Sequence, residues 1–225
     1  MESVAQRRDA LPAAVLALSS TLFAAFTFAA IAWERGDELD VRFVEWVHRT
    51  APDSLIDVMR TLTHSGSGLF LGLLAAVAAV ILVRLGRARA GAFVALAFAS
   101  SEIIDQLLKA AFRRARPELD DPFVQLTTYA FPSGHAFAAT ATYGALALVF
   151  TASTTTARRA LALALAAALV ALVGASRVII GVHYLLDVFA GIAGGIAVLS
   201  ALLLVFAPRS DPAREEEPEG ARLDA

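Results

Sequence analysis

Six long apolar blocks decide what this chain can fold into. They comprise residues 11–33, 67–83, 90–111, 135–151, 160–175 and 184–207. A bilayer core about 30 Å thick needs about 20 apolar residues in a helix, and the blocks approach this length, although the fourth and fifth are short. They are rich in Ala and Leu and too long for strands. We therefore expect an all-α, polytopic membrane protein with six transmembrane helices.

The composition agrees with a membrane protein and excludes several other classes. Hydrophobic residues make up 58% of the chain and charged residues 18%, whereas a soluble domain has about a quarter charged residues. So much apolar sequence excludes intrinsic disorder, and a net charge of −2 excludes a nucleic-acid partner. The chain has no cysteine, which excludes disulfides, cysteine-based zinc sites, iron–sulfur clusters and thiol catalysis.

The remaining segments suggest one domain with a tail. Residues 1–207 are expected to form the membrane domain, and the charged, proline-containing residues 208–225 a disordered cytoplasmic tail. The first block is longer than a signal-peptide core of about 7–15 residues, so we interpret it as a retained span. Between the first and second blocks, residues 34–65 mix acids with Val44, Trp46 and Val47, which predicts a short amphipathic helix at the interface.

The basic residues between the blocks predict the orientation. Lys and Arg number ten on the side of both termini and the links around residues 84–89 and 158–159, against nine on the other side. Three of these nine, Lys109, Arg116 and Arg177, belong to the polar clusters described next. Without them, the second side has six basic residues against ten on the side of the termini. We therefore expect a multi-pass protein of the cell membrane with both termini in the cytoplasm and residues 34–65 and 113–132 outside.

Polar residues gather in three clusters at the ends of apolar blocks, on the side expected to face outward. In the first, Lys109 and Arg116 are separated by about two helical turns, which predicts that they share a helical face ended by Pro117. The alternative is a basic helix end that meets lipid headgroups.

In the second cluster, the sequence Phe-Pro-Ser-Gly-His at residues 131–135 precedes a predicted helix, whose N-terminal N–H groups suit an anion. The alternative is an ordinary N-cap and turn.

The third cluster contains Arg177, His183 and Asp187. The last two are spaced i, i+4, which predicts that they lie on one helical face. A carboxylate there can accept the N–H of one ring nitrogen and leave the other nucleophilic, while Arg177 can bind a phosphate. The alternative is a buried structural ion pair. Together the clusters favour a phosphate ligand, because their cations can stabilise the charge of phosphoryl transfer.

The three clusters resemble the three-part signature of the type 2 phosphatidic acid phosphatase (PAP2) superfamily, and the six-block layout is similar to its bacterial integral-membrane branch. The resemblance covers residues 109–187 and includes every fixed position at the family spacing. It implies that His183 is the nucleophile that forms a phosphohistidine, that Asp187 orients it, and that His135 is the general acid. It further implies phosphate binding by a set of five residues: Lys109, Arg116, Ser133, Gly134 and Arg177.

The resemblance also implies a reaction without metal or cofactor, on a lipid phosphate or pyrophosphate at the outer membrane surface. Polyprenyl pyrophosphate, phosphatidylglycerophosphate and phosphatidate are all open as substrates. Two other functions stay open. A vanadate-dependent haloperoxidase shares these site residues, but such enzymes are soluble, which six spans argue against. A non-catalytic binder or transporter of lipid phosphates would not need both histidines and Asp187.

Some polar and glycine residues lie outside the signature. Asp105 and Lys109 are spaced i, i+4, so we interpret Asp105 as charge compensation for a buried lysine; the alternative is that Glu102 and Asp105 tune the site or contact a pyrophosphate. We interpret His48 and His64 as interfacial residues, not ligands. The glycines in or near the last two blocks are expected to pack helices closely: Gly174, Gly181, Gly191, Gly194 and Gly195. The spacing of residues 191–195 is typical of a helix-contact motif and suggests a homodimer.

Overall fold

The computed structural model describes residues 4–119 and 126–206 of the chain, with side chains from residue 10 onward. The predicted tail at 208–225 lies outside these residues. Within them the regular structure is entirely helical, which confirms the all-α class. The elements are α1 (Val4–Thr27), the π-helix η1 (Phe28–Ala32), α2 (Glu34–Thr50), α3 (Asp53–Leu62), the 3₁₀-helix η2 (Thr63–Gly66), α4 (Gly68–Arg84), α5 (Ala88–Phe112), α6 (Gly134–Phe150), α7 (Thr156–Ile179) and α8 (Leu185–Phe206).

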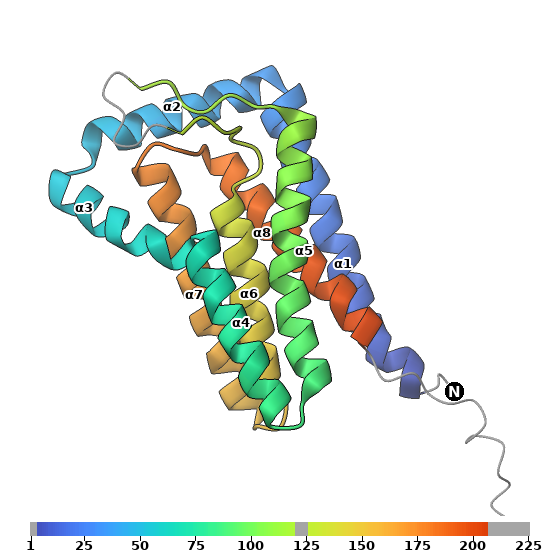
Figure 1. Cartoon of the computed structure of the whole chain (residues 1–225). Coiled ribbons are helices and arrows are strands. Elements are labelled where there is room, and N and C mark those ends of the chain that lie inside the picture. Colours follow the sequence, from blue (N-terminus) through green and yellow to red (C-terminus); the bar gives the residue numbers. More distant parts are fainter. Residues whose placement is uncertain (1–3, 120–125, 207–225) are drawn as a thin grey trace, which may run out of the picture.

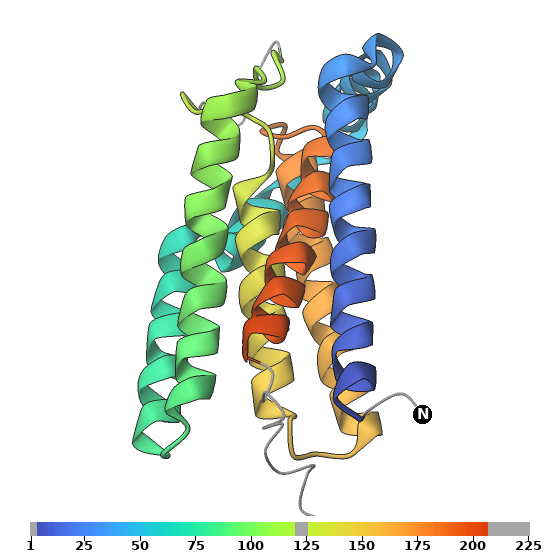
Figure 2. The same ribbon diagram turned by 90° about the vertical axis from the view of Figure 1, so that its right-hand side faces the viewer.

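Six of these helices run alongside one another as a bundle, and each corresponds to one of the predicted apolar blocks (Figures 1 and 2). Helix α6 lies in the middle and contacts α4, α5, α7 and α8, while α1 packs mainly along α8. Helices α2 and α3 lie at one end of the bundle, with α2 crossing it (Figure 1). The C-terminus of α5 and the N-terminus of α6 lie at the same end (Figure 1).

The lengths of the apolar helices fit a membrane protein. Four segments of the described chain are long and apolar enough to cross a bilayer: Ala10–Ala32, Ala88–Phe112, Thr156–Ile179 and Leu185–Phe206. A fifth span is obtained if the pair Asp53–Gly66 and Gly68–Arg84, bent by 42°, is counted as one. Large side chains on α4, such as Leu69 and Leu73, are 77% and 60% exposed. Water would not favour such a surface, whereas lipid would cover it.

The segment between the first two long helices differs from the single amphipathic helix predicted there. It forms two helices, α2 and α3, separated at Ala51, whose backbone is extended, and Pro52. The proline ring disfavours a helical conformation at the preceding residue, which explains the break. Helix α2 is amphipathic as expected, since Val44 is 1% exposed and Trp46 is 60% exposed.

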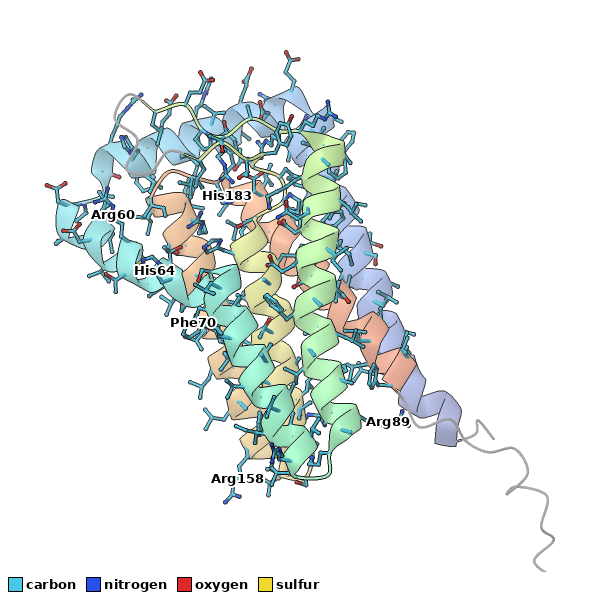
Figure 3. All side chains as sticks on the ribbon, viewed as in Figure 1. Arg60, His64, Phe70, Arg89, Arg158 and His183 are labelled. Carbon is cyan, nitrogen blue, oxygen red and sulfur yellow. The ribbon has the colours of Figure 1, made fainter. Side chains whose placement is uncertain are left out.

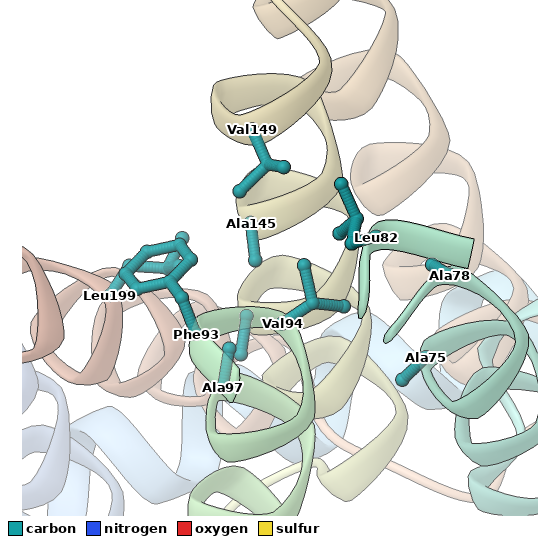
Figure 4. Packing of buried hydrophobic residues seen from close by; sticks show 10 residues of the cluster. Ala75, Ala78, Leu82, Phe93, Val94, Ala97, Ala145, Val149 and Leu199 are labelled. Atoms are coloured by element: carbon teal, nitrogen blue, oxygen red, sulfur yellow. The ribbon is translucent and has the colours of Figure 1, made fainter. Parts of the chain in front are cut away.

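The largest apolar core lies at the end of the bundle away from α2 and α3. It is built from the C-terminal half of α4, the N-terminal half of α5 and the C-terminal halves of α6 and α8 (Figure 4). Alanines at helix contacts, such as Ala97 and Ala145, let the backbones approach, and Leu82 and Val94 are completely buried among them. This packing leaves the opposite end of the bundle for polar side chains.

The glycines of α8 allow a close approach to α6 within the same chain. A Cβ atom at Gly191 would lie 2.6 Å from the carbonyl oxygen of Ser133, and one at Gly195 would lie 2.6 Å from Cβ of Thr140. Their interpretation as packing residues is confirmed, whereas Gly181 lies in the turn after α7 with a left-handed backbone (φ 74°). The spacing that suggested a homodimer is thus used inside the bundle, and it places α8 directly against the N-terminal turn of α6.

Candidate active site

A cavity of about 580 Å³ lies at the α3 end of the bundle, between η2 and helices α5, α6 and α7. Figure 3 shows His64 and His183 at this end, far from Arg89 and Arg158 at the other. The cavity wall includes six of the eight site residues predicted from the sequence: Lys109, Arg116, Gly134, His135, Arg177 and His183. These residues come from three helices and two connecting segments, so the fold brings the three clusters to one place.

His183 lies in the turn between α7 and α8, not in a helix. Helix α8 begins only at Leu185, so the prediction that His183 and Asp187 share a helical face is wrong. The predicted contact nevertheless forms, because Nδ1 of His183 lies 3.3 Å from Oδ2 of Asp187. The same oxygen accepts the backbone N–H of Tyr184 at 3.0 Å. The Asp187 carboxylate therefore bonds the free N–H of the turn and holds the imidazole beside it.

The other ring nitrogen of His183 faces the cations of the cavity. Its Nε2 lies 3.3 Å from Nη1 of Arg116. Burial, together with the charges of Arg116 and Arg177, holds the pKa of His183 well below its ordinary value, so the ring is neutral at neutral pH. With Asp187 accepting from Nδ1–H, the lone pair is on Nε2. This nitrogen is the one available for nucleophilic attack.

The chain leaves α5 earlier than predicted. The helix ends at Phe112, and Arg113 adopts a left-handed conformation with φ 49°. Lys109 and Arg116 therefore do not share a helical face, and Pro117 does not end the helix. Instead, Arg116 lies in the non-helical segment that follows, where its guanidinium donates to the carbonyl oxygen of Thr128 at 2.7 Å and to the Thr128 hydroxyl at 2.8 Å. This binding directs the guanidinium into the cavity.

Lys109 is the cation contributed by the last turn of α5. It is 7% exposed, and its ammonium group donates to both carboxylate oxygens of Asp105, which confirms the predicted pair. Gly134 lies against this pair: a Cβ atom there would be 2.7 Å from Oδ2 of Asp105 and 3.0 Å from Nζ of Lys109. The absence of a side chain at residue 134 therefore leaves room for the ion pair at the N-terminus of α6.

Two further helix ends complete the wall. His135 lies in the first turn of α6, whose backbone N–H groups have no acceptor within the helix. Arg177 lies in the last turn of α7 and is 6% exposed. Its Nη1 donates to the hydroxyl of Thr63 at 2.9 Å, while its Nε has no partner. Both side chains line the cavity.

The remaining two predicted site residues lie behind the wall. Asp187 is fully buried and reaches the cavity through His183. Ser133 is the N-cap residue of α6 and is also fully buried; its backbone N–H donates to the carbonyl oxygen of Asp187 at 3.0 Å, and its hydroxyl has no partner. Ser133 therefore connects the N-terminus of α6 to α8, while its hydroxyl is buried beside the site without a hydrogen-bond partner.

Sequence reasoning missed several residues of this region. Thr63 and His64, from η2, line the cavity, although His64 was interpreted as interfacial. Arg114 lies behind His183 and donates to Asp187. Its basic character was visible, but in a run of arginines nothing marked it as different from its neighbours. The amphipathic pattern of residues 34–65 indicated only an interfacial helix and gave no sign that this segment closes a cavity.

The chemistry of the wall suits an anion. Among residues 4–119 and 126–206, no group of three or more His, Asp or Glu side chains is placed to hold a metal ion. The cavity wall instead includes the cationic side chains of Arg60, Lys109, Arg116 and Arg177, the imidazoles of His64, His135 and His183, and the N-terminus of α6. The carboxylates of Glu102 and Asp105 also line it, and Asp105 is paired with Lys109. This arrangement can bind a tetrahedral oxyanion and present a nucleophilic nitrogen to its central atom.

Comparison with known proteins gives consistent matches. The sequence model of the PAP2 superfamily matches residues 90–211. Phosphatidylglycerophosphatase B of Bacillus subtilis (strain 168) is 30% identical over 144 residues, which cover 63% of this chain and 70% of that protein. The fold is similar to the crystal structure of a transmembrane PAP2-type phosphatidylglycerolphosphate phosphatase from Bacillus subtilis, with a TM-score of 0.74 and 24% identity over 85% of this chain and 93% of that one. Aquifex aeolicus LpxE matches with a TM-score of 0.56 and 24% identity, covering 73% of this chain and 94% of that one.

Proposed function

This chain belongs to the PAP2 superfamily, and from that premise we propose that it is an integral-membrane lipid phosphatase acting through a phosphohistidine intermediate. The observation that carries the proposal is the meeting of His183 and His135 with three cationic side chains around one cavity. A site that only bound lipid phosphates would need the cations. It would not need a buried carboxylate that directs the lone pair of His183 toward them.

The proposed reaction has two steps. In the first, Nε2 of His183 attacks phosphorus, the bond from phosphorus to the lipid oxygen breaks, and His135 donates a proton to the departing oxygen. In the second, His135 takes a proton from water, the water oxygen attacks phosphorus, and the phosphorus–nitrogen bond breaks to release phosphate. Lys109, Arg116, Arg177 and the N-terminus of α6, with Ser133 and Gly134, hold the non-bridging oxygens in both steps. No metal or cofactor takes part.

The substrate we favour is phosphatidylglycerophosphate, because a relative that is 30% identical carries the name phosphatidylglycerophosphatase B. Phosphatidate and polyprenyl pyrophosphate are the other members of the proposed substrate class. All three carry a terminal phosphate on an apolar anchor. The cavity lies at the end of apolar helices, so a terminal phosphate can reach it while the chains stay in lipid.

We further propose six membrane spans, with the cavity outside the cell and both termini in the cytoplasm. Arg89 and Arg158 lie at the end of the bundle opposite His183 (Figure 3), and an excess of basic residues favours the cytoplasmic side. The six bundle helices include α4 and α6, each with 17 residues. A helix of that length rises about 25 Å, so these two would cross a bilayer thinned around the protein.

The proposal is tested by phosphate release from a panel of lipids in liposomes made with the purified protein. The panel contains phosphatidylglycerophosphate, phosphatidate and a polyprenyl pyrophosphate, and a soluble sugar phosphate serves as the comparison. We expect release from at least one lipid and far less from the sugar phosphate. No release from any lipid, or equal release by a variant without His183, would contradict the proposal.

Substituting Gly134 by Ala is expected to lower kcat/KM by about 10- to 100-fold, the loss expected when one charge-assisted hydrogen bond is displaced. The new Cβ would overlap Asp105 and push the Lys109 ammonium group away from its place. The measurement is the rate of phosphate release against lipid concentration, together with the thermal unfolding midpoint.

Gly144→Ala provides the matched control for this prediction. Gly144 lies on the same helix, and its Cβ would lie 2.4 Å from Cδ1 of Leu199, in the apolar core. We expect this variant to keep kcat/KM, even where its unfolding midpoint falls. If both substitutions lowered activity equally, the effect of residue 134 would come from a general disturbance of α6.

A further inference from the structure

A second charged cluster lies behind His183, away from the cavity. Its centre is Arg114, whose Nη1 donates to Oδ1 of Asp187 at 2.6 Å. Its Nη2 donates to Oδ1 of Asp37 at 2.6 Å and to Oδ2 of Asp40 at 3.0 Å. One guanidinium therefore joins the first turn of α8 to helix α2, which crosses this end of the bundle (Figure 1).

Asp40 contributes a second bond to the same place. Its Oδ1 accepts the backbone N–H of Leu186 at 3.1 Å, one of the N–H groups that a helix cannot satisfy in its first turn. Asp40 is 4% exposed and Arg114 9% exposed, and the ring of Tyr184 lies 4.1 Å from the Arg114 guanidinium carbon. Helix α2 thus fixes both the backbone and the carboxylate of the turn that carries Asp187.

The two oxygens of Asp187 have different partners, and this division determines the direction of His183. Oδ1 accepts from Arg114, while Oδ2 accepts from the backbone N–H of Tyr184 and lies beside Nδ1 of His183. With Oδ1 bound by Arg114, rotation of the carboxylate is blocked. Oδ2 is then kept toward the imidazole, whose Nε2 is directed to the cavity.

We propose that Arg114 and Asp40 are positioning residues for phosphoryl transfer: α2 holds Arg114, Arg114 holds Asp187, and Asp187 holds the nucleophilic imidazole. This inference rests on the proposed phosphatase function. It assigns to the interfacial helix α2 a part in the reaction, although no residue of α2 lines the cavity.

The position of the two residues predicts which kinetic constant they affect. Neither Arg114 nor Asp40 lines the cavity, and the cations that would bind phosphate have other partners, such as Thr128 for Arg116 and Thr63 for Arg177. Loss of the cluster therefore leaves the phosphate binders in place and lets the imidazole turn. Turnover falls while the affinity for the lipid changes little.

The test uses two single variants, because removing a buried arginine can prevent folding. Arg114→Lys keeps the charge, but one ammonium group cannot reproduce the fork that bonds α2 and Asp187 at once. Asp40→Asn keeps an oxygen for the N–H of Leu186 and removes the charge that faces Arg114. The control is Glu45→Gln, which removes a carboxylate of the same helix whose partner, Arg49, is exposed.

Each variant is assayed in the full-length protein for kcat and KM of phosphate release from the lipid that wild type hydrolyses fastest. We expect Arg114→Lys to lower kcat by about 10- to 100-fold and Asp40→Asn by about 3- to 10-fold, with KM within about threefold of wild type in both. Glu45→Gln should match wild type. In an Asp187→Asn background, Arg114→Lys should lower kcat by no more than about twofold, because both act through one carboxylate.

Several results would overturn the inference. They are full kcat in both Arg114→Lys and Asp40→Asn, a rise in KM in place of a fall in kcat, and independent losses from Arg114→Lys and Asp187→Asn. An equal loss in Glu45→Gln would mean that any charge change in α2 disturbs the protein. Failure of wild type to release phosphate from every lipid tested would instead refute the proposed function, and this inference with it.

Discussion

Replacing His183 by Ala is expected to reduce phosphate release by at least about 10³-fold, because the variant lacks the nitrogen that we propose attacks phosphorus. The protein should stay folded. Asp187 would lose its contact with the imidazole but keep its bonds from Arg114 and from the backbone N–H of Tyr184, so no buried charge is left without a partner. The measurements are kcat with the best lipid substrate and the thermal unfolding midpoint.

His48→Ala is the matched control for this variant, since His48 lies in α2 and does not line the cavity. We expect it to retain wild-type turnover. Retention of more than a few per cent of activity by His183→Ala would mean that another group, or water itself, attacks phosphorus. Loss of activity accompanied by unfolding would require His183→Gln, which is closer in volume, before any conclusion about the nucleophile.

Replacing His135 by Ala is expected to lower kcat for a lipid phosphate by about 10²- to 10⁴-fold, the usual contribution of general acid–base catalysis. The size of the loss should depend on the leaving group. A lipid alkoxide is a strong base and needs a proton to depart, whereas the phenolate of an activated aryl phosphate does not. We therefore expect the first step to be much less impaired with the aryl substrate, measured as the pre-steady-state burst of released phenol.

The comparison of the two substrates decides the role of His135. For each substrate, the rate of the variant is divided by the rate of wild type. If this fold loss were the same for the aryl phosphate and the lipid phosphate, His135 would act by binding phosphate. A protonation role predicts that the two losses differ by at least tenfold. Substituting Thr63, which also lines the cavity but carries no proton-transfer group, should affect both substrates alike.

The apolar blocks were sufficient to predict all six bundle helices, because burial in lipid or in the core requires each of them to be apolar on most sides. Local rules were less successful at the helix ends. Pro117 is an evident stop signal, and the sequence therefore predicted a helix through Arg116. The helix ends at Phe112 instead, and Arg114, two residues beyond it, is bonded to Asp37, Asp40 and Asp187. These partners are distant in sequence, and no local pattern reveals them.

The sequence predicted most of the charged residues and histidines that meet at the candidate site, but it predicted their arrangement less well. The spacing of His183 and Asp187 correctly indicated a contact, yet the contact forms across a turn, because α8 starts two residues after His183. Asp105 and Lys109 pair as predicted, since both lie within α5 and are spaced i, i+4. Asp40 gave no signal, because a carboxylate on an amphipathic helix is normally solvated, and only the packing of α2 over α8 buries it.

The central claim is that Nε2 of His183 receives the phosphoryl group, and trapping this intermediate tests the claim most directly. His135→Ala is mixed rapidly with a labelled aryl phosphate, so that the first step proceeds without a proton donor while the water of the second step is not activated. The mixture is quenched in base, and the labelled peptide is identified by mass spectrometry. We predict one base-stable, acid-labile phosphate per protein, located on His183 and absent when His183 is also replaced. Continued release of phenol with no phosphate on the protein, or phosphate on a different residue, would contradict the account.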